Sequence, residues 1–126
     1  MMQHSKKRIV LSSLYLGTGE LERSLVDSIE SNLATNPNLS VKVLLDYSRG
    51  LRGQSNSRTL MQHLISKHPS QMSLHLYHTP KLRGLSKRYM PERLNESIGV
   101  LHMKIYIADD TLIISGLSFF LFRIFL

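Results

Sequence analysis

The sequence contains no cysteine and no long apolar run of the kind that spans a membrane. The lack of cysteine excludes a disulfide framework and a thiolate metal site. The basic N-terminal residues have no apolar h-region, so we expect no secretory signal, and they are too few for an amphipathic transit peptide. Acidic residues are also scarce: nine Asp and Glu stand against sixteen Lys and Arg, which gives a net charge of +7. This balance favours anionic partners, namely phosphates, nucleic acid or acidic lipid surfaces.

The chain has 126 residues, of which 42% are hydrophobic, and this is enough for one small domain with a core. Residues 8–16, 41–45 and 72–77 are rich in apolar and β-branched side chains and predict strands. Residues 20–34 and 57–67 carry apolar side chains at helical spacing. Strands that alternate with helices predict an α/β fold with a mixed sheet flanked by helices.

The two predicted helices have recognisable ends. Leu21, Leu25, Ile29 and Leu33 fall near one face of the first helix, which we expect to be its buried face. For the second helix, the polar residues at 56–57 supply an N-cap. A proline shortly after each helix closes it.

Residues 102–107 (HMKIYI) alternate between polar and apolar side chains, and this period of two predicts a strand. His102 and Lys104 then point to the same face of the sheet, while Met103 and the two isoleucines face a core. Two aspartates follow as a turn, and residues 111–115 predict the returning strand.

His102, Lys104 and Asp109 form the pattern H-x-K-x4-D, which suits phosphoryl chemistry. A neutral imidazole can attack phosphorus or relay a proton near neutral pH. A fixed ammonium can hold the non-bridging oxygens as charge builds up, and a carboxylate can orient the imidazole. Three residue types at fixed spacing also arise by chance, and a histidine in a sheet is more often structural than catalytic, so the pattern by itself is a hypothesis.

The pattern resembles the motif of the phospholipase D superfamily. Two further stretches, 13–20 (SLYLGTGE) and 45–53 (LDYSRGLRG), resemble the lipid synthases of that superfamily, as does 99–109 around the motif. The resemblance runs from about residue 8 to residue 116. It implies a partial phospholipase D-like domain over residues 1–116, that is, one incomplete half of the family fold, followed by an apolar tail at 117–126 that lacks family features.

The resemblance also implies an activity. Such synthases transfer a phosphatidyl group from CDP-diacylglycerol to glycerol 3-phosphate through a phosphohistidine, in the phospholipid pathway that leads to cardiolipin, without a metal or cofactor. They are membrane-associated and mitochondrial. The residues that match are the expected catalytic trio His102, Lys104 and Asp109 and the expected substrate-binding residues Arg49, Arg52 and Tyr106.

The family uses two copies of the motif, and this chain has one. The chain is therefore expected to be inactive alone and to need a second half-site. Two alternatives stay open: a non-catalytic fragment that interacts with the full enzyme, and a nuclease-like member that builds its site from two identical chains. The match at 45–53 argues against the nuclease, so nucleic acid is not the expected partner.

Two basic segments have both a functional and an ordinary interpretation. Arg49 and Arg52 lie between glycines in the predicted loop 46–55, where they could bind a phosphate or form a solvated turn. The basic stretch 79–97 could contact a phosphate headgroup or an anionic membrane, or be solvated. The remaining histidines lack nearby ligands at metal-binding spacing, so no metal site is expected.

Overall fold

A computed structural model describes residues 1–51, 56–79, 101–115 and 119–123. Nine elements precede the last strand in chain order: the 3-10 helix η1 (Met2–His4), β1 (Arg8–Ser13), α1 (Glu20–Thr35), β2 (Ser40–Asp46), α2 (Tyr47–Gly50), α3 (Ser57–Lys67), β3 (Met72–Tyr77), β4 (Lys104–Ala108) and β5 (Thr111–Ser115). The last described element is β6 (Phe119–Arg123). The predicted α/β class is confirmed.

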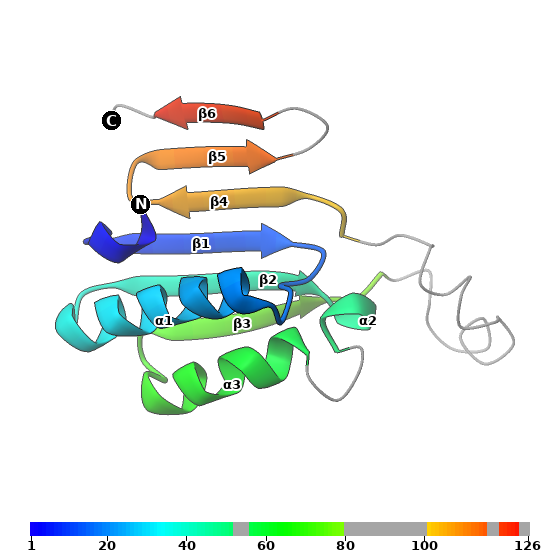
Figure 1. Ribbon diagram of the computed structural model, residues 1–126, viewed down its shortest axis with the longest axis horizontal. Coiled ribbons are helices and arrows are strands. Elements are labelled where there is room, and N and C mark those ends of the chain that lie inside the picture. The colour runs from blue at the N-terminus through cyan, green and yellow to red at the C-terminus, as the bar shows by residue number, and fades with distance from the viewer. Residues whose placement is uncertain (52–55, 80–100, 116–118, 124–126) are drawn as a thin grey trace, which may run out of the picture.

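The six strands form one mixed sheet in the order β3-β2-β1-β4-β5-β6, as Figure 1 shows. The first three strands are parallel to one another, and β4 runs antiparallel to β1. The hairpin β4–β5 continues antiparallel, and β6 extends it. Central β1 therefore separates a parallel half from an antiparallel half. The segment predicted as an apolar tail contributes β6.

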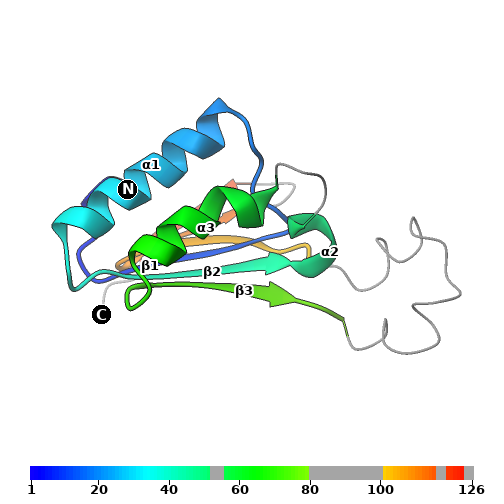
Figure 2. The same cartoon turned by 90° about the horizontal axis from the view of Figure 1, so that it is seen from below.

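Helices α1 and α3 lie on the same side of the sheet, which Figure 2 shows edge-on. The core fills the space between this helical layer and the parallel half. Its fully buried members include Ile9 and Leu11 from β1, Val41 and Val43 from β2, and Ile29 from α1. The alternation of buried and exposed residues along β2 is what the predicted period of two requires.

The apolar half of the motif strand was assigned to the wrong environment. Ile105 and Ile107 pair with Ser12 and Val10, on the face of the sheet opposite to Tyr106 and Leu11, which pack in the core. They are only half-buried, and Met103 is 43% exposed. Strand alternation separates two faces but does not say which one the helices cover, and here Tyr106 is on the face that packs against the core.

Two smaller expectations also differ from the structure. Leu21 is 84% exposed, because the buried stripe of α1 runs through Val26, Ile29 and Leu33 instead. Residues 47–50, predicted as loop, form the short helix α2. The predicted N-cap Asn56 is confirmed: its side chain accepts from the Thr59 N–H, and the Thr59 hydroxyl accepts from the Asn56 N–H. Residues 80–97 of the predicted basic stretch 79–97 lie outside the described residues, as does Arg52.

Candidate active site

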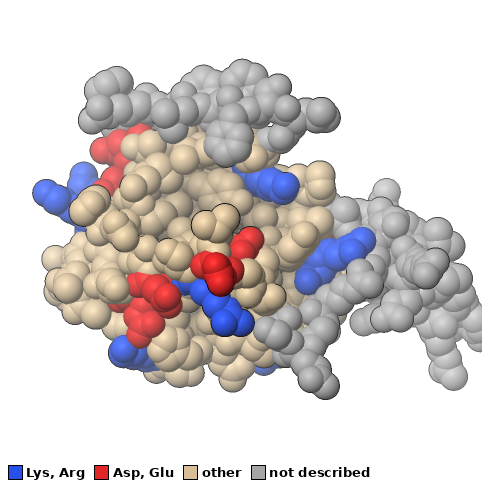
Figure 3. Space-filling view, in the orientation of Figure 1, with Lys and Arg blue, Asp and Glu red and all other residues tan. Residues whose placement is uncertain are grey.

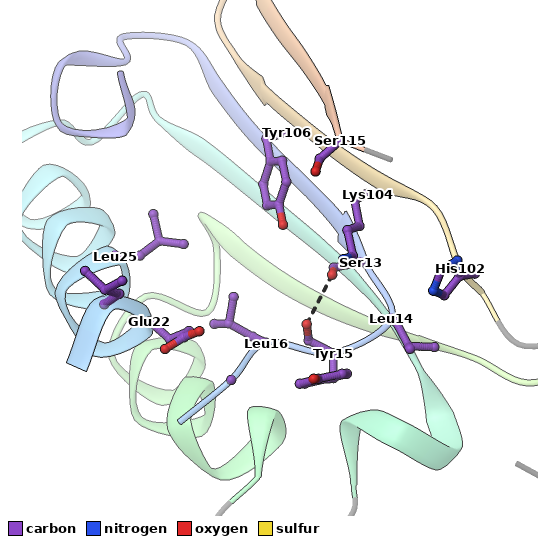
Figure 4. A pocket seen from close by; sticks show the side chains of 12 residues that line it. Ser13, Leu14, Tyr15, Leu16, Glu22, Leu25, His102, Lys104, Tyr106 and Ser115 are labelled. Atoms are coloured by element: carbon purple, nitrogen blue, oxygen red, sulfur yellow. Dashed lines mark hydrogen bonds between the residues drawn. The ribbon is translucent and has the colours of Figure 1, made fainter. Parts of the chain in front are cut away.

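A cavity of about 600 Å³ opens where β1 ends and α1 begins, on the helical side of the sheet (Figure 4). Three parts of the chain form its wall: the segment that leaves β1, the first two turns of α1, and the open end of the β4–β5 hairpin, where Lys104 pairs with Ser115. The lining residues are Ser13, Leu14, Tyr15, Leu16 and Gly17; Leu21, Glu22 and Leu25; and His102, Lys104, Tyr106 and Ser115.

His102 and Lys104 both line this cavity, as residues two apart on an extended segment should. Lys104 is the first residue of β4, and His102 precedes the strand. Both side chains are exposed. Among the residues that the structure describes, neither the His102 ring nor the Lys104 ammonium has a hydrogen-bond partner. Both side chains are therefore available to a ligand. Figure 4 shows them on the same wall of the cavity, with Tyr106 further along the strand.

Asp109 does not join them. It lies at the opposite end of β4, in the turn before β5, and is not part of the cavity wall. Its carboxylate accepts the backbone N–H groups of Lys6, Lys7 and Arg8 at 2.7, 2.8 and 3.0 Å. Its backbone adopts φ +50°, a left-handed conformation that Asp tolerates. The Asp109 geometry is that of a clamp between the hairpin and the start of β1.

These contacts perturb the titration of Asp109. Burial alone would raise the pKa of this carboxyl group, but the backbone N–H donors of Arg8, Lys6 and Lys7 outweigh burial and hold the pKa below its usual value. Hydrogen bonds to the ionised form favour that form. Asp109 is therefore a carboxylate at neutral pH.

The loop that follows β1 is held in place by α3. Ser57, the first residue of α3, is 2% exposed, and its hydroxyl donates to the Leu16 carbonyl and accepts the Leu16 N–H at 2.9 Å. Ser13 donates to the Tyr15 carbonyl at 3.1 Å, the dashed line in Figure 4. The part of the cavity wall between β1 and α1 is thus held at Tyr15 by Ser13 and at Leu16 by Ser57.

Gly17 packs closely against the Glu22 side chain. A Cβ at Gly17 would lie 2.6 Å from a Glu22 carboxylate oxygen, and a Cβ at Gly19 would lie 2.8 Å from the other. The two glycines let the Glu22 carboxylate fold back over the loop at the cavity. Glu22, Tyr15 and Ser115 were missed as candidate site residues. Tyr15 lies within the stretch 13–20, which resembles the lipid synthases, and Glu22 lies just after it; this position could have indicated both residues.

The predicted substrate-binding residues have different positions. Tyr106 lines the cavity and also packs against the core. Arg49 is on α2, at the carboxyl end of β2, and is not part of the cavity wall. On the face with the helices, basic and acidic side chains are interspersed on a mostly uncharged surface (Figure 3). Within the described ranges, no cluster of three or more His, Asp or Glu side chains could hold a metal ion. No described helix is long and apolar enough to cross a bilayer.

Comparison with solved structures shows which kind of enzyme has a similar fold. The fold is similar to that of a phosphatidylserine synthase from Haemophilus influenzae Rd KW20, with a TM-score of 0.60 and 27% identity over 90% of this chain and 24% of that one. No family model matches.

The sequence comparisons are more particular. The chain is 50% identical over 118 residues to the mitochondrial CDP-diacylglycerol–glycerol-3-phosphate 3-phosphatidyltransferase of Gallus gallus, and 48% identical to that of Homo sapiens. It is 45% identical to the corresponding transferase of Schizosaccharomyces pombe. Each alignment with the two vertebrate enzymes covers 89% of this chain but only 21% of the relative. The chain therefore spans about a fifth of the length of these enzymes.

Proposed function

We propose that this chain supplies one half of a phosphatidyl-transfer site, which takes CDP-diacylglycerol as donor and glycerol 3-phosphate as acceptor. The observation that carries the proposal is the shared position of His102 and Lys104, both exposed, on one wall of the cavity beside β1. The names of the relatives, at 45–50% identity, supply the substrates. The proposed setting is the mitochondrial membrane, by analogy with the same relatives.

The proposed chemistry follows from the two side chains. An imidazole attacks the phosphorus that carries the diacylglycerol, forming an N–P bond as the bond to CMP breaks, and CMP leaves with the electron pair. The glycerol 3-phosphate hydroxyl then attacks phosphorus, loses its proton to a base and displaces the imidazole. Lys104 holds the non-bridging oxygens as their charge increases. His102 is either the attacking imidazole or the group that handles the proton, and the second imidazole comes from the other half-site.

The test uses the purified chain with CDP-diacylglycerol in mixed micelles. We expect binding that is weakened at least tenfold by His102→Ala, and no phosphatidylglycerophosphate from labelled glycerol 3-phosphate without a second half-site. The matched control is His75→Ala, an exposed histidine on β3 that does not line the cavity. Equal loss in both variants would contradict the assignment of the site.

The same preparation distinguishes the alternatives. Cleavage of DNA by a dimer, measured with the solution mass, would replace the proposal with the nuclease interpretation. A chain that binds neither CDP-diacylglycerol nor DNA but associates with the full-length relative would favour a non-catalytic interaction fragment. Product formation by the chain alone, lost in His102→Ala, would show that no second half-site is needed.

A further inference from the structure

Asp46 is a buried carboxylate at the carboxyl end of β2, with 3% of its surface exposed. One of its oxygens, Oδ1, accepts the N–H groups of Ser48 and Arg49 at 2.9 and 3.2 Å. The other, Oδ2, accepts the N–H of Leu101 at 3.0 Å. The two oxygens therefore serve two segments, one directly after Asp46 and the other 55 residues away from it in sequence.

The same residue also holds the loop that leaves β1. The Asp46 N–H donates to the carbonyl of Leu14 at 3.2 Å, and Leu14 lines the cavity. One residue thus contacts three segments around the candidate site: the wall at Leu14, the helix that carries Arg49, and the residue directly before His102.

The position of His102 depends on such a contact. β4 begins only at Lys104, and its described pairing with β1 extends no further than Ile105. His102 therefore lies between a strand that fixes it on one side and Leu101, whose N–H is held by Asp46, on the other. A free segment at this place would let the imidazole move relative to the ammonium of Lys104.

The choice of a carboxylate is also informative. Burying a carboxylate costs free energy unless several donors compensate it. Asp46 has three N–H donors spread over both oxygens, and hydrogen bonds to an ionised acceptor are shorter and stronger than neutral ones. An asparagine has a single acceptor oxygen, which could accept either from the N–H groups of Ser48 and Arg49 or from that of Leu101. Its amide N–H₂ would then face the remaining N–H donor. Capping α2 alone would need only Oδ1.

We propose that Asp46 is a positioning residue, which holds His102 beside Lys104 through the Leu101 N–H and ties both to the cavity wall at Leu14. The assignment rests on the proposed function, because it is the phosphate of the donor that requires a fixed pair. Catalytic groups need support that keeps them within a fraction of an ångström, and a remote contact that sets this geometry has large effects on binding and rate.

The experiment compares the unmodified chain with Asp46→Asn by NMR. The readouts are amide hydrogen exchange at Leu101, the ring resonances of His102, and the affinity for CDP-diacylglycerol in mixed micelles. We expect exchange at Leu101 to accelerate about tenfold or more when the charge-assisted hydrogen bond is lost. The His102 resonances should move toward those of an unstructured peptide, and affinity should fall about tenfold as preorganisation is lost.

A variant matched for lost stability separates positioning from general destabilisation. Leu33→Ala opens a cavity beneath α1, far along the helix from the site, and should lower the melting temperature without altering the His102 resonances or the affinity for CDP-diacylglycerol. If Leu33→Ala changes the His102 resonances as Asp46→Asn does, the positioning role is wrong.

A third variant covers the case in which Asp46→Asn does not fold. Leu101→Pro removes the donor, although it also fixes φ and replaces the leucine side chain; it leaves Asp46 to cap α2 and should reproduce the changes at His102. In the unmodified chain, unprotected exchange at Leu101 would by itself overturn the proposal. Unchanged His102 resonances in a folded Asp46→Asn or Leu101→Pro chain would also overturn it. If the unmodified chain fails to bind CDP-diacylglycerol, the proposed function fails, while the exchange and ring readouts still decide whether Asp46 positions His102.

Discussion

Lys104 places an exposed ammonium at the start of β4, on the same cavity wall as His102. Replacing it by Met keeps most of the apolar stem and removes the charge. We expect Lys104→Met to weaken binding of CDP-diacylglycerol by about tenfold or more, because a hydrogen bond to a charged group contributes about 1.5–3 kcal/mol. Isothermal titration with mixed micelles measures this loss.

Lys42→Met is the matched control for Lys104→Met. Lys42 is an exposed lysine on β2, and it does not line the cavity. Both variants should keep their free energy of unfolding within about 0.5 kcal/mol, as surface substitutions usually do. Equal weakening of binding in both would mean that the lipid responds to overall charge and not to the cavity.

Asp109 governs how the fold responds to acid. Its pKa in the folded chain lies below the usual 3.8. The carboxylate therefore contributes stability that is complete above the unfolded pKa and is lost as the pH falls through the folded pKa. Asparagine also tolerates the left-handed backbone at this position, so Asp109→Asn removes the charge without adding strain.

We expect Asp109→Asn to lower the free energy of unfolding by about 1 kcal/mol at neutral pH, below the range for buried hydrogen bonds to a charged group because solvent screens the partly exposed carboxylate. The difference from the unmodified chain should shrink below about pH 4, where the carboxyl group protonates. Urea unfolding between neutral and acidic pH measures it. Asp110→Asn, an exposed neighbour, is the control, and a pH-independent difference would contradict the clamp.

At the scale of elements, the cavity depends on the attachment of the β1–α1 loop to α3. Ser57→Ala removes the hydroxyl that bonds both backbone groups of Leu16. We expect a loss of about 1–3 kcal/mol in the free energy of unfolding, since buried partners are left unsatisfied, together with weaker binding of CDP-diacylglycerol. Calorimetry and micelle titration measure the two effects.

Ser66→Ala provides the comparison on the same helix. The Ser66 hydroxyl donates to the carbonyl one turn earlier, on the exposed face of α3. Its loss should change stability by no more than about 0.5 kcal/mol and leave binding intact. Comparable effects from both serines would show that the loop does not depend on the Ser57 contact.

Local patterns were sufficient for most elements. The period of two in residues 102–107 predicted an extended segment with His102 and Lys104 on one face, and the structure places both on one cavity wall. The same pattern could not say which face the helices cover, because alternation is symmetric. That is why Met103 was wrongly assigned to a core. The error at Leu21 has another source: helical spacing gave a stripe through Leu21, whereas the buried stripe of α1 runs through Val26, Ile29 and Leu33.

The contacts that define the site are mostly non-local and left no trace in the sequence. Asp109 reaches Lys6 across 103 positions, and Asp46 reaches Leu101 across 55. Spacing suggested that Asp109 would orient the imidazole, but that role is still only a prediction, and the structure gives its carboxylate a different set of partners. A carboxylate can serve an imidazole or backbone N–H groups, and only the sheet order decides which it meets.

At the scale of the whole molecule, the net charge of +7 favours the proposed binding to anionic lipid. We expect the chain to bind vesicles containing anionic lipid at low ionic strength and to dissociate at high salt, because the Debye length falls from about 30 Å at 0.01 M to about 3 Å at 1 M. Co-sedimentation with vesicles measures this, with neutral vesicles as the control. Salt-independent binding would mean that apolar contacts dominate.

The order of the strands has a consequence for synthesis on the ribosome. Of the described strands β1 comes first in the sequence, yet it lies inside the sheet, between β2 and β4. One of its edges acquires a neighbour within the first 46 residues, whereas the other must wait until residues 104–108 have emerged. Pairing between strands that are distant in sequence slows folding, and until it forms the unpaired edge of β1 is prone to aggregation. A chaperone that shields this edge during translation would raise the yield of soluble product more than one that acts after release.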